Sequence, residues 1–285
     1  MQAIIMSAYR DFDELSRLLD IYSKYFNCYV HIDKKSAFSD SQHLEILNSK
    51  NNVYAISLYK IKWGSYYHLL SLATLLKEAM KNKENTRFHL ISDADFPVKS
   101  YSEFERFFDA NEHNYIEVCD ITNMPVMQKR YQIYHLQHIF DRKSKNKLFI
   151  YIDKIIRNLQ YSLGIKRKTT YAYKGLVWGS ITREAAKICL DYLTQKRIAN
   201  LKYCENSEEF WLTNAILFSR LKNTVVRDNL RYAVWDYKNV NGPKVLDISN
   251  LSEIELSNAF FARKIIRHDD PLYIALQDKF TDNAY

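Results

Sequence analysis

The sequence has few of the residues that interrupt regular structure, and it lacks the short motifs that mark several enzyme classes. Five glycines and four prolines are spread over 285 residues, so disordered and low-complexity segments are not expected. No run reaches the ~20 apolar residues that cross a bilayer. GxSxG elbows, Gly-rich phosphate loops and internal repeats are also missing. With 47% hydrophobic and 26% charged residues, the chain has the composition of an ordinary globular protein.

Cysteine and histidine occur without metal-binding or disulfide patterns. We therefore predict reduced thiols in a cytoplasmic protein and no zinc site. His135 and His138 are three residues apart, but no acidic or cysteine residue is spaced to complete a metal site with them. Residues 1–9 have a short apolar run and no charged segment, which predicts a first strand and not a signal peptide. The four cysteines, none in CxxC spacing, are Cys28, Cys119, Cys189 and Cys204.

Basic residues are in excess. The net charge of +8 and the pI of about 9.1 suit an anionic partner such as a nucleotide-sugar, a phospholipid or a nucleic acid. No helix-turn-helix, RNP or zinc-finger signature is present, so we do not expect nucleic-acid binding. Residues 142–168 hold nine basic residues and one acid, Asp153, among many apolar side chains. This segment predicts either peripheral contact with the inner face of an anionic cell membrane or an ordinary helix with a solvated basic face.

Strand and helix patterns alternate along the first half of the chain. This alternation predicts an α/β fold with a mostly parallel sheet flanked by helices. No Gly-, Pro- or Ser-rich linker divides the chain, so we predict a single domain over 1–285, with a nucleotide-binding half at 1–120 and an acceptor and catalytic half at 121–285. Strands are predicted at 3–7, 28–33, 53–58, 88–92, 115–118 and, with a turn, 172–180. Helices are predicted at 11–25, 42–47, 65–80, 102–108, 184–193, 208–221 and 270–279.

Two acidic residues, Asp33 and Asp93, follow predicted strands. Parallel sheets bind ligands beyond the carboxyl ends of their strands, so both residues should lie near a ligand crevice. In His31-Ile32-Asp33-Lys34-Lys35 the carboxylate can accept a hydrogen bond from a ribose or a uracil, and the lysines can face phosphate. Asp93-Ala94-Asp95 is an Asp-x-Asp motif that could hold Mg²⁺ or Mn²⁺ against a diphosphate. Because Pro97 follows, an acidic turn is the alternative.

A carboxylate pair and a distant cation pair are the strongest chemical signals. Glu208 and Glu209 open an apolar run, with Ser207 as the predicted N-cap of a helix. A carboxylate there can act as a general base, or it can simply complement the helix dipole. Arg263 and Lys264 end another apolar run and could neutralise a departing diphosphate. Together these residues predict group transfer from a nucleotide-activated donor.

Six short stretches, taken in order, resemble the core-2/I-branching β-1,6-N-acetylglucosaminyltransferase family, which includes the peptide O-xylosyltransferases. The resemblance covers nearly the whole chain. The stretches are His31-Ile32-Asp33-Lys34-Lys35, Trp63-Gly64-Ser65, Asp95-Phe96-Pro97-Val98-Lys99, Gly175-Leu176-Val177-Trp178 with Thr182-Arg183-Glu184, Glu208 through Thr213, and Phe261-Ala262-Arg263-Lys264.

The resemblance implies a GT-A-type fold and an inverting reaction that needs neither a cofactor nor a metal. It places the catalytic base on Glu208, with Glu209 as the competing candidate if the register slips by one. It also assigns donor-diphosphate binding to Lys264 and Arg263, with Arg231 as a further candidate. Nucleotide binding is expected of His31, Asp33, Lys35 and Asp95. Acceptor or sugar binding is expected of Trp63, Arg130, Trp178 and Glu209.

The sequence departs from the family pattern in three ways. Asp93 completes an Asp-x-Asp that the family lacks, and Leu176 replaces the usual serine. The membrane anchor and luminal cysteines of animal members are absent. We therefore expect a bacterial, cytoplasmic member that moves a sugar, with N-acetylglucosamine favoured, from a UDP-sugar to a saccharide hydroxyl that a lipid carrier could present. UDP-galactofuranose, UDP-galactose and UDP-xylose are alternative donors, and a non-catalytic carbohydrate-binding protein is the alternative of another class.

Overall fold

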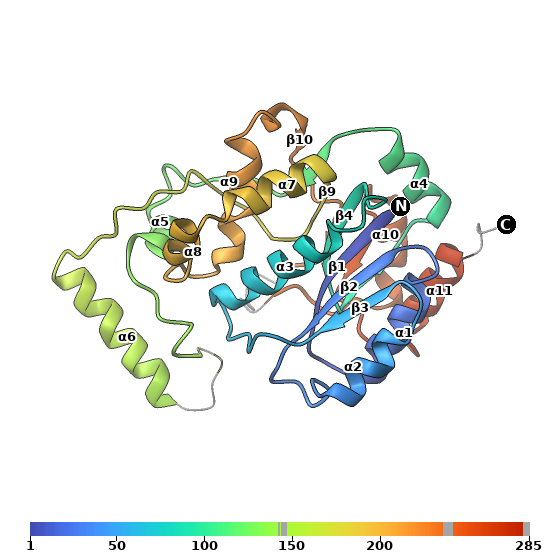
Figure 1. Ribbon diagram of the computed structural model, residues 1–285, viewed down its shortest axis with the longest axis horizontal. Helices are drawn as coiled ribbons and strands as arrows, with labels where there is room; N and C mark the ends of the chain where they lie inside the picture. The colour runs from blue at the N-terminus through green and yellow to red at the C-terminus, as the bar shows by residue number, and fades with distance from the viewer. Residues whose placement is uncertain (142, 144–146, 236–241, 282–285) are drawn as a thin grey trace.

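The computed structural model describes residues 1–141, 143, 147–235 and 242–281, and it has a central sheet with helices on both faces (Figure 1). The strands of this sheet are β1 (Gln2–Ala8), β2 (Asn27–Ile32), β3 (Val53–Ile56), β4 (Arg87–Ser92), β6 (Asn114–Ile116), β9 (Gly179–Thr182) and β10 (Val225–Val226). Their order is β10-β6-β9-β4-β1-β2-β3. β1 to β4 are mutually parallel, whereas β9 runs antiparallel to β4 and β6. The predicted α/β fold with a mostly parallel sheet is thereby confirmed.

The strand β1 shows why helices cover both faces of the sheet. All of its residues are buried. Ile4 and Met6 belong to one core cluster, whereas Ala3 and Ile5 belong to another. Successive side chains of a strand point to opposite faces, so a strand that is apolar throughout needs a cover on each. The first cluster includes α1 (Phe12–Tyr22), α4 (Tyr101–Asp109) and α11 (Pro271–Thr281), and the second includes α3 (Tyr66–Ala79), α7 (Arg183–Tyr192) and α9 (Leu212–Leu217).

Local capping sets where the helices begin. The side chain of Asp11 accepts hydrogen bonds from two backbone amides at the start of α1, and Ser100 and Glu103 form a capping box at the start of α4. The predicted helices of the first half, and those at 184–193 and 270–279, are confirmed. The other helices are α2 (Ser41–Asn48), α5 (Pro125–Gln132), α6 (Lys147–Ser162), α8 (Gln195–Leu201) and α10 (Leu251–Leu256), with 3-10 turns η1 (Ser207–Phe210), η2 (Lys222–Thr224) and η3 (Ile248–Asn250).

Two small sheets complete the described structure. β7 (Cys119–Asp120) pairs with β8 (Tyr173–Lys174), and β12 (Phe261–Arg263) lies between β11 (Arg231–Ala233) and β5 (Asp95–Pro97). The acidic turn predicted as the alternative is present at residues 93–94. Its extension to Pro97 is wrong, because residues 95–97 form an edge strand with Arg263 opposite Asp95. An edge strand tolerates a proline because its missing N–H need not serve the ladder.

The single helix predicted at 208–221 is also wrong. The chain forms the turn η1, then the short helix α9, and it leaves α-helix after Leu217. The N-cap of η1 is Asn206, in a left-handed conformation, and not Ser207. Phe210 and Trp211 are both fully buried. Burial of two adjacent aromatic rings, together with the left-handed Asn206, overrides the helical periodicity.

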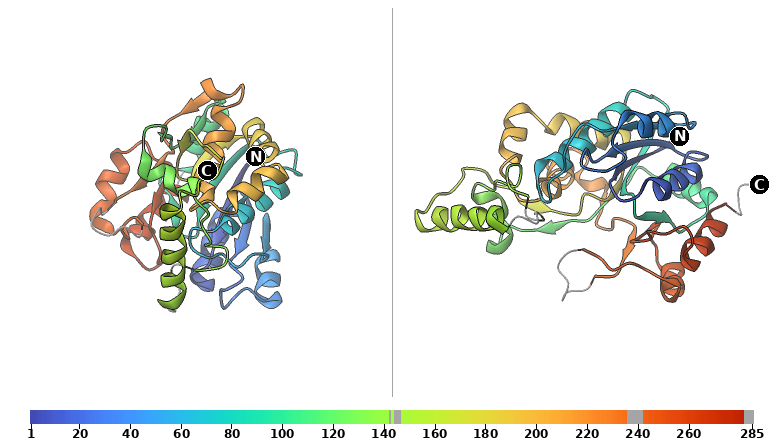
Figure 2. Two further views of the ribbon diagram at one scale, coloured as in Figure 1. Left: turned by 90° about the vertical axis from the view of Figure 1, so that its left-hand side faces the viewer. Right: turned by 90° about the horizontal axis from the view of Figure 1, so that it is seen from below.

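The helix α6 lies apart from the main body. In Figure 1 and in the right-hand view of Figure 2 it lies at the end of the molecule away from α11. Among the described residues, no helix is long and apolar enough to cross a bilayer. All four cysteines are free, and only Cys119 is not buried.

Candidate active site

The candidate site lies at the carboxyl ends of β1, β2 and β4. The backbone amide of Asp33 donates to Ala8 O at 2.9 Å, and that of Asp93 donates to Ser7 O at 3.2 Å. The two acids that follow β2 and β4 are thus joined directly to the end of β1. This is the edge at which parallel sheets bind ligands, and it is where the sequence places Asp33 and Asp93.

Glu208 reaches this edge from η1, more than a hundred residues further along the chain. Its Oε1 lies 3.2 Å from Nδ1 of His68, in the first turn of α3. His68 Nε2 in turn lies 3.2 Å from Ser7 Oγ, at the end of β1. A Ser7 hydroxyl that donates to Nε2 leaves Nδ1–H to donate to the carboxylate. Oε2 of Glu208 is buried and has no hydrogen-bond partner among the described residues.

The neighbouring acid, Glu209, is fully engaged in a different cluster. Arg130 Nη1 and Lys174 Nζ each lie 2.8 Å from its Oε2, and Asn206 Nδ2 donates to its Oε1 at 3.2 Å. Two cations and an amide thus occupy both oxygens of the Glu209 carboxylate, whereas Oε2 of Glu208 has no partner among the described residues. Arg130, predicted on the acceptor side, is placed here as a partner of Glu209.

Trp178 connects the carboxylate to the predicted cation pair. Its ring centroid lies 5.9 Å from that of His68, and the guanidinium carbon of Arg263 lies 4.5 Å from the same indole centroid. Cation–π contacts of this kind favour Arg over an aromatic face. Glu208 and Arg263 are thus linked through two intervening side chains and border one region of the molecule. The common reaction centre of Glu208 and Arg263 stays a prediction that this chain of contacts supports.

A cluster of cations surrounds Lys264. Burial, followed by the charges of Arg10, Arg263 and Lys143, lowers the pKa of the Lys264 ammonium group. Arg263 is buried, and its Nε and Nη1 have no hydrogen-bond partner among the described residues; Nη1 of Arg10 is in the same state. Buried N–H groups without acceptors are costly unless a ligand supplies them. The cluster is therefore suited to a multivalent anion such as a diphosphate.

The carboxylates of the Asp-x-Asp motif point to different partners. Asp93 Oδ2 accepts from the backbone amides of Tyr9 and Arg10, and its Oδ1 lies 3.7 Å from Arg10 Nε. Asp95 Oδ2 accepts from Ser92, and its Oδ1 lies 3.7 Å from Arg263 Nε. Burial raises the pKa of the Asp93 carboxyl group, and Arg10 opposes the increase. Each acid thus positions an arginine of the cation cluster, and Asp95, with a side chain that is 0% exposed, does so from the interior.

The motif at 31–35 organises the loops next to the cation cluster. Asp33 Oδ1 accepts from the backbone amides of Lys35 and Ile61, and Lys35 Nζ lies 3.3 Å from Asp141 Oδ2. His31 is completely buried, and its Nε2 accepts from two backbone amides after β3. Burial, and then the charge of His68, lowers the pKa of His31 to about 4, so its ring is neutral. The nucleotide contacts of His31, Asp33 and Lys35 stay predictions, and the observed bonds of His31 are structural.

Arg231 joins the small sheet to the main one. Its Nη1 donates to Ser180 Oγ at 2.9 Å and its Nη2 donates to Gly179 O at 2.8 Å. Burial lowers its pKa to about 9, with a smaller effect in the same direction from Arg263. Nη1 and Nη2 also donate to the carbonyls of Asn229 and Leu90, so Nε is the remaining free donor of Arg231 among the described residues. Its diphosphate contact stays a prediction.

The turn Trp63-Gly64-Ser65 packs against Asn206, the N-cap residue of η1. Gly64 has a φ of 73°, and its carbonyl accepts from the amide of Asn206 at 2.9 Å. A Cβ at position 64 would lie 2.7 Å from Asn206 Oδ1. Trp63 is 37% exposed, with Lys143 Nζ 5.3 Å from its ring centroid. Its sugar-binding role stays a prediction, but it lies beside a member of the cation cluster.

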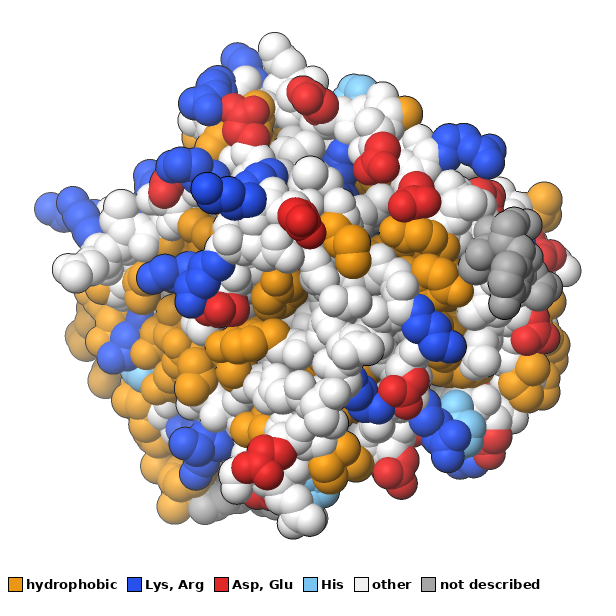
Figure 3. All heavy atoms as spheres, turned by 45° about the vertical axis from the view of Figure 1, so that its right-hand side comes forward, with side chains coloured by type: hydrophobic (Ala, Val, Ile, Leu, Met, Phe, Trp, Pro, Cys, Tyr) orange, Lys and Arg blue, Asp and Glu red, His pale blue; other side chains and the backbone are white. Residues whose placement is uncertain are grey.

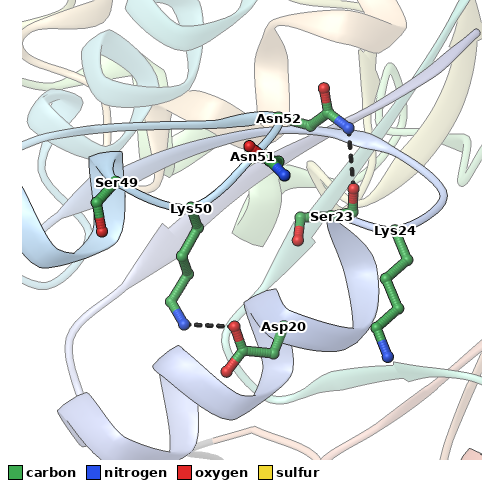
Figure 4. Close-up of a pocket in the computed structure, with 7 residues that line it drawn as sticks. All are labelled: Asp20, Ser23, Lys24, Ser49, Lys50, Asn51 and Asn52. Carbon is green, nitrogen blue, oxygen red and sulfur yellow. Dashed lines mark hydrogen bonds and ion pairs between the residues drawn. The ribbon is translucent and has the colours of Figure 1, made fainter.

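A separate surface hollow lies near the amino ends of β2 and β3, away from these residues (Figure 4). Lys50 pairs with Asp20 across it, and Asn52 Nδ2 donates to Ser23 O at 3.0 Å. Since its polar groups bond to one another at the opposite edge of the sheet, this hollow is not the ligand site. Its lining residues are Asp20, Ser23, Lys24, Ser49, Lys50, Asn51 and Asn52.

Three residues of the site were missed from the sequence: Ser7, Arg10 and His68. Ser7 and Arg10 lie at the carboxyl end of β1. The rule that identified Asp33 and Asp93, a polar residue at the carboxyl end of a parallel strand, would also have identified these two. His68 carries no comparable signal, because it is one histidine within an amphipathic helix. Only the approach of η1 to α3 reveals its role. The described residues contain no group of three or more His, Cys, Asp or Glu side chains that could hold a metal ion.

Comparison with solved structures finds distant similarity. S. aureus TarS 1–349 matches with 15% identity and a TM-score of 0.28, over 47% of this chain and 41% of that one. A putative glucose-1-phosphate thymidylyltransferase from Bacillus anthracis in complex with a sucrose matches with 11% identity and a TM-score of 0.35, over 79% and 85% of the two chains. Mouse xyloside xylosyltransferase 1 in its apo form matches with 11% identity and a TM-score of 0.38, over 92% and 96%. No curated protein matches the chain.

The comparison with family models is decisive. The model described as Core-2/I-Branching enzyme matches residues 3–260, which include Glu208, His68, Trp178 and both acids of the Asp-x-Asp motif. This match spans most of the chain. The protein is a glycosyltransferase and belongs to the Core-2/I-Branching enzyme family.

Proposed function

We propose that the protein transfers a sugar from a UDP-sugar to a saccharide hydroxyl with inversion at the anomeric carbon and without a metal ion. N-acetylglucosamine is the favoured sugar. The observation that carries this proposal is the arrangement of Glu208 and the cation cluster on the two sides of Trp178. A base and an anion site that border one region are what a single displacement at the anomeric carbon requires.

In the proposed reaction Glu208 takes the proton of the acceptor hydroxyl. The acceptor oxygen forms its bond to the anomeric carbon from one face while the bond to the UDP oxygen breaks on the other. The transition state is oxocarbenium-like, as in glycoside hydrolysis. The hydrogen bond from His68 orients the carboxylate and leaves Oε2 without a partner. A positioned carboxylate of this kind typically contributes about 10²–10⁴-fold to the rate.

The charge that develops on UDP is stabilised by the cation cluster. Arg263 and Arg10 supply N–H groups that lack acceptors, and Lys264 supplies an ammonium group. Fixed cations in a partly enclosed site can serve the electrostatic role that a divalent metal serves elsewhere. Asp93 and Asp95 support the proposal of metal independence because each is directed at an arginine.

The experiment that tests this function is a panel of UDP-sugars screened for UDP release with a saccharide acceptor, with and without EDTA. We expect one donor to be turned over, with the same rate in EDTA, since the cation cluster occupies the place of a metal. Strict dependence on Mn²⁺ would instead assign Asp93 and Asp95 to metal binding. Sugar binding without release of UDP from any donor would identify a carbohydrate-binding protein.

Substitution of His68 provides a second test, of whether its hydrogen bond positions the carboxylate of Glu208. Replacing His68 with leucine should lower kcat by about tenfold, because one hydrogen bond to a charged group contributes about 1.5–3 kcal/mol. His68→Gln keeps an N–H donor and should recover much of the rate. An equal loss of kcat in His68→Leu and His68→Gln would show that His68 only packs.

The proposed cellular setting is the bacterial cytoplasm, where the enzyme would add a sugar to a capsule or lipopolysaccharide unit. A lipid carrier would present that acceptor at the inner face of the cell membrane. The excess of basic residues supports an anionic donor and an anionic surface, and a role with nucleic acid is not proposed.

A further inference from the structure

The helix α6 turns its apolar side chains away from the protein. Four of them recur every three or four residues and form one stripe, which we call the outward stripe. Asp153 and Gln160 of the same helix are buried. A helix that packs on a globular protein ordinarily does the reverse, with its apolar side inward and its polar side in water. The outward stripe consists of Leu148 (58% exposed), Tyr151 (62%), Ile155 (46%) and Leu159 (55%).

Polar contacts hold α6 in this orientation. Gln160 Oε1 accepts from the backbone amide of Tyr134 at 2.8 Å, and Gln160 Nε2 donates to Tyr134 O at 2.9 Å. Within the helix, Asp153 lies 3.1 Å from Arg157 Nε. The two bonds between Gln160 and Tyr134 make the inner face specific, because buried polar groups must find their partners. Rotating the helix to bury the outward stripe would break these two bonds.

Basic side chains surround the outward stripe. The lysines among the described residues are exposed, whereas Arg157 is half-buried and Arg167 is buried. Arg142 and residues 144–146 of the basic segment lie outside the described residues. By contrast, the face of the molecule in Figure 3 has basic and acidic side chains interspersed. In the described part of this segment, exposed lysines without an exposed acid thus accompany the apolar stripe of α6. The exposed lysines are Lys143, Lys147, Lys154, Lys166 and Lys168.

We propose that the outward stripe of α6 is a docking surface for an anionic membrane, with the helix lying in the plane of the interface. An apolar stripe flanked by lysines matches a bilayer whose headgroups are negative and whose acyl chains lie just beneath. A second copy of the chain fits less well, because pairing two stripes would bring two sets of lysines together. Of the two alternatives predicted from the sequence, the proposal takes membrane contact, because a helix with an ordinary solvated face would keep its apolar side inward.

The docking surface is connected to the candidate active site. Arg167, just beyond α6, donates to Tyr131 O at 2.9 Å and to Tyr203 O at 3.2 Å. The preceding residue of α5, Arg130, pairs with Glu209 next to the catalytic Glu208. A membrane bound at α6 would thus lie on the side of the molecule that carries the α5 contacts of the catalytic turn.

Vesicle flotation of the full chain tests the proposal. We expect the protein to float with phosphatidylcholine vesicles that contain phosphatidylglycerol and not with phosphatidylcholine alone. Ile155→Gln with Leu159→Gln should weaken binding by about tenfold or more, because the inserted apolar area is lost. Lys147→Glu with Lys154→Glu should weaken it at least as much, at about fivefold per charge near an anionic surface. Leu256→Gln, at an 88% exposed leucine of α10, and Lys83→Glu are the matched controls.

Equal binding by the wild type and both double variants would overturn the proposal, as would equal binding to neutral and anionic vesicles. Sedimentation velocity without lipid tests the competing occupant: a dimer that Ile155→Gln with Leu159→Gln converts to a monomer would assign the stripe to self-association. Far-UV circular dichroism checks that glutamine keeps the helix. Since the flotation contains no donor, its result is independent of the proposed sugar transfer.

Discussion

Replacing Glu208 with glutamine should leave the affinity for UDP within about twofold of the wild type and lower turnover by about a hundredfold or more. The amide keeps the size of the side chain but cannot take the proton of the acceptor hydroxyl, and general base catalysis typically contributes about 10²–10⁴-fold. The hydrogen bond to His68 can still form through the amide oxygen. Turnover with saturating donor and acceptor, together with a UDP titration, measures both quantities.

The matched control is Glu209→Gln at the adjacent position. Glu209 is paired with Arg130 and Lys174, so its amide variant should lose stability, by about 1–3 kcal/mol, because two cations lose their charged partner. Its turnover should fall far less than that of Glu208→Gln. Near wild-type turnover in Glu208→Gln, or the larger loss in Glu209→Gln, would transfer the role of base to another residue.

Replacing Lys264 with methionine should weaken UDP binding by about ten- to a hundredfold and leave the binding of uridine unchanged. A hydrogen bond between charged groups contributes about 1.5–3 kcal/mol, and uridine has no phosphate to receive it. Lys244→Met is the control, because Lys244 is an exposed lysine whose backbone carbonyl bonds to the amide of Lys264. Equal losses for UDP and uridine would place Lys264 at the nucleoside instead.

The same lysine should make UDP binding depend on pH. Burial and the charges of Arg10, Arg263 and Lys143 lower the pKa of Lys264 below that of an ordinary lysine. Its charged form, which we propose binds the diphosphate, is present below the lowered pKa and is lost as the pH rises through it. UDP affinity should therefore fall on the alkaline side earlier than an unperturbed lysine would allow. A bound diphosphate stabilises the charged ammonium group and so raises the pKa of Lys264 again. In the pH range where free Lys264 has lost its proton, UDP binding should therefore take up a proton. Lys264→Met should abolish this uptake.

The sequence predicts the sheet and its edge well because both depend on local patterns. Apolar strands followed by Asp33 and Asp93 identify the carboxyl edge without knowledge of the tertiary structure. The pairing of Glu208 with His68 depends on an approach between residues 140 positions apart, which no periodicity encodes. The same holds for η1, where burial of Phe210 and Trp211 replaces the expected helix.

The cation cluster likewise has one part that the sequence predicts and one part that only tertiary contacts reveal. The pair Arg263-Lys264 is visible in the sequence, yet the side chain that completes its surroundings, Arg10, comes from the end of β1. In the sequence Arg231 is as good a candidate for binding an anion as Arg263, but its guanidinium group donates to Ser180 and Gly179 of β9. Sequence alone identifies which residues can neutralise an anion, whereas tertiary contacts decide which of them have donors to spare.

The contact between Gly64 and Asn206 implies that Glu208, the proposed proton acceptor, is aligned from a distance. A side chain added at Gly64 would displace η1, because the Gly64 carbonyl is bonded to the Asn206 amide and a Cβ there would lie 2.7 Å from Asn206 Oδ1. A substitution at Gly64 would therefore imitate damage to Glu208 in an activity screen while altering no reacting group. Variants that fail in such a screen should be sorted by whether the alignment or the chemistry has been lost.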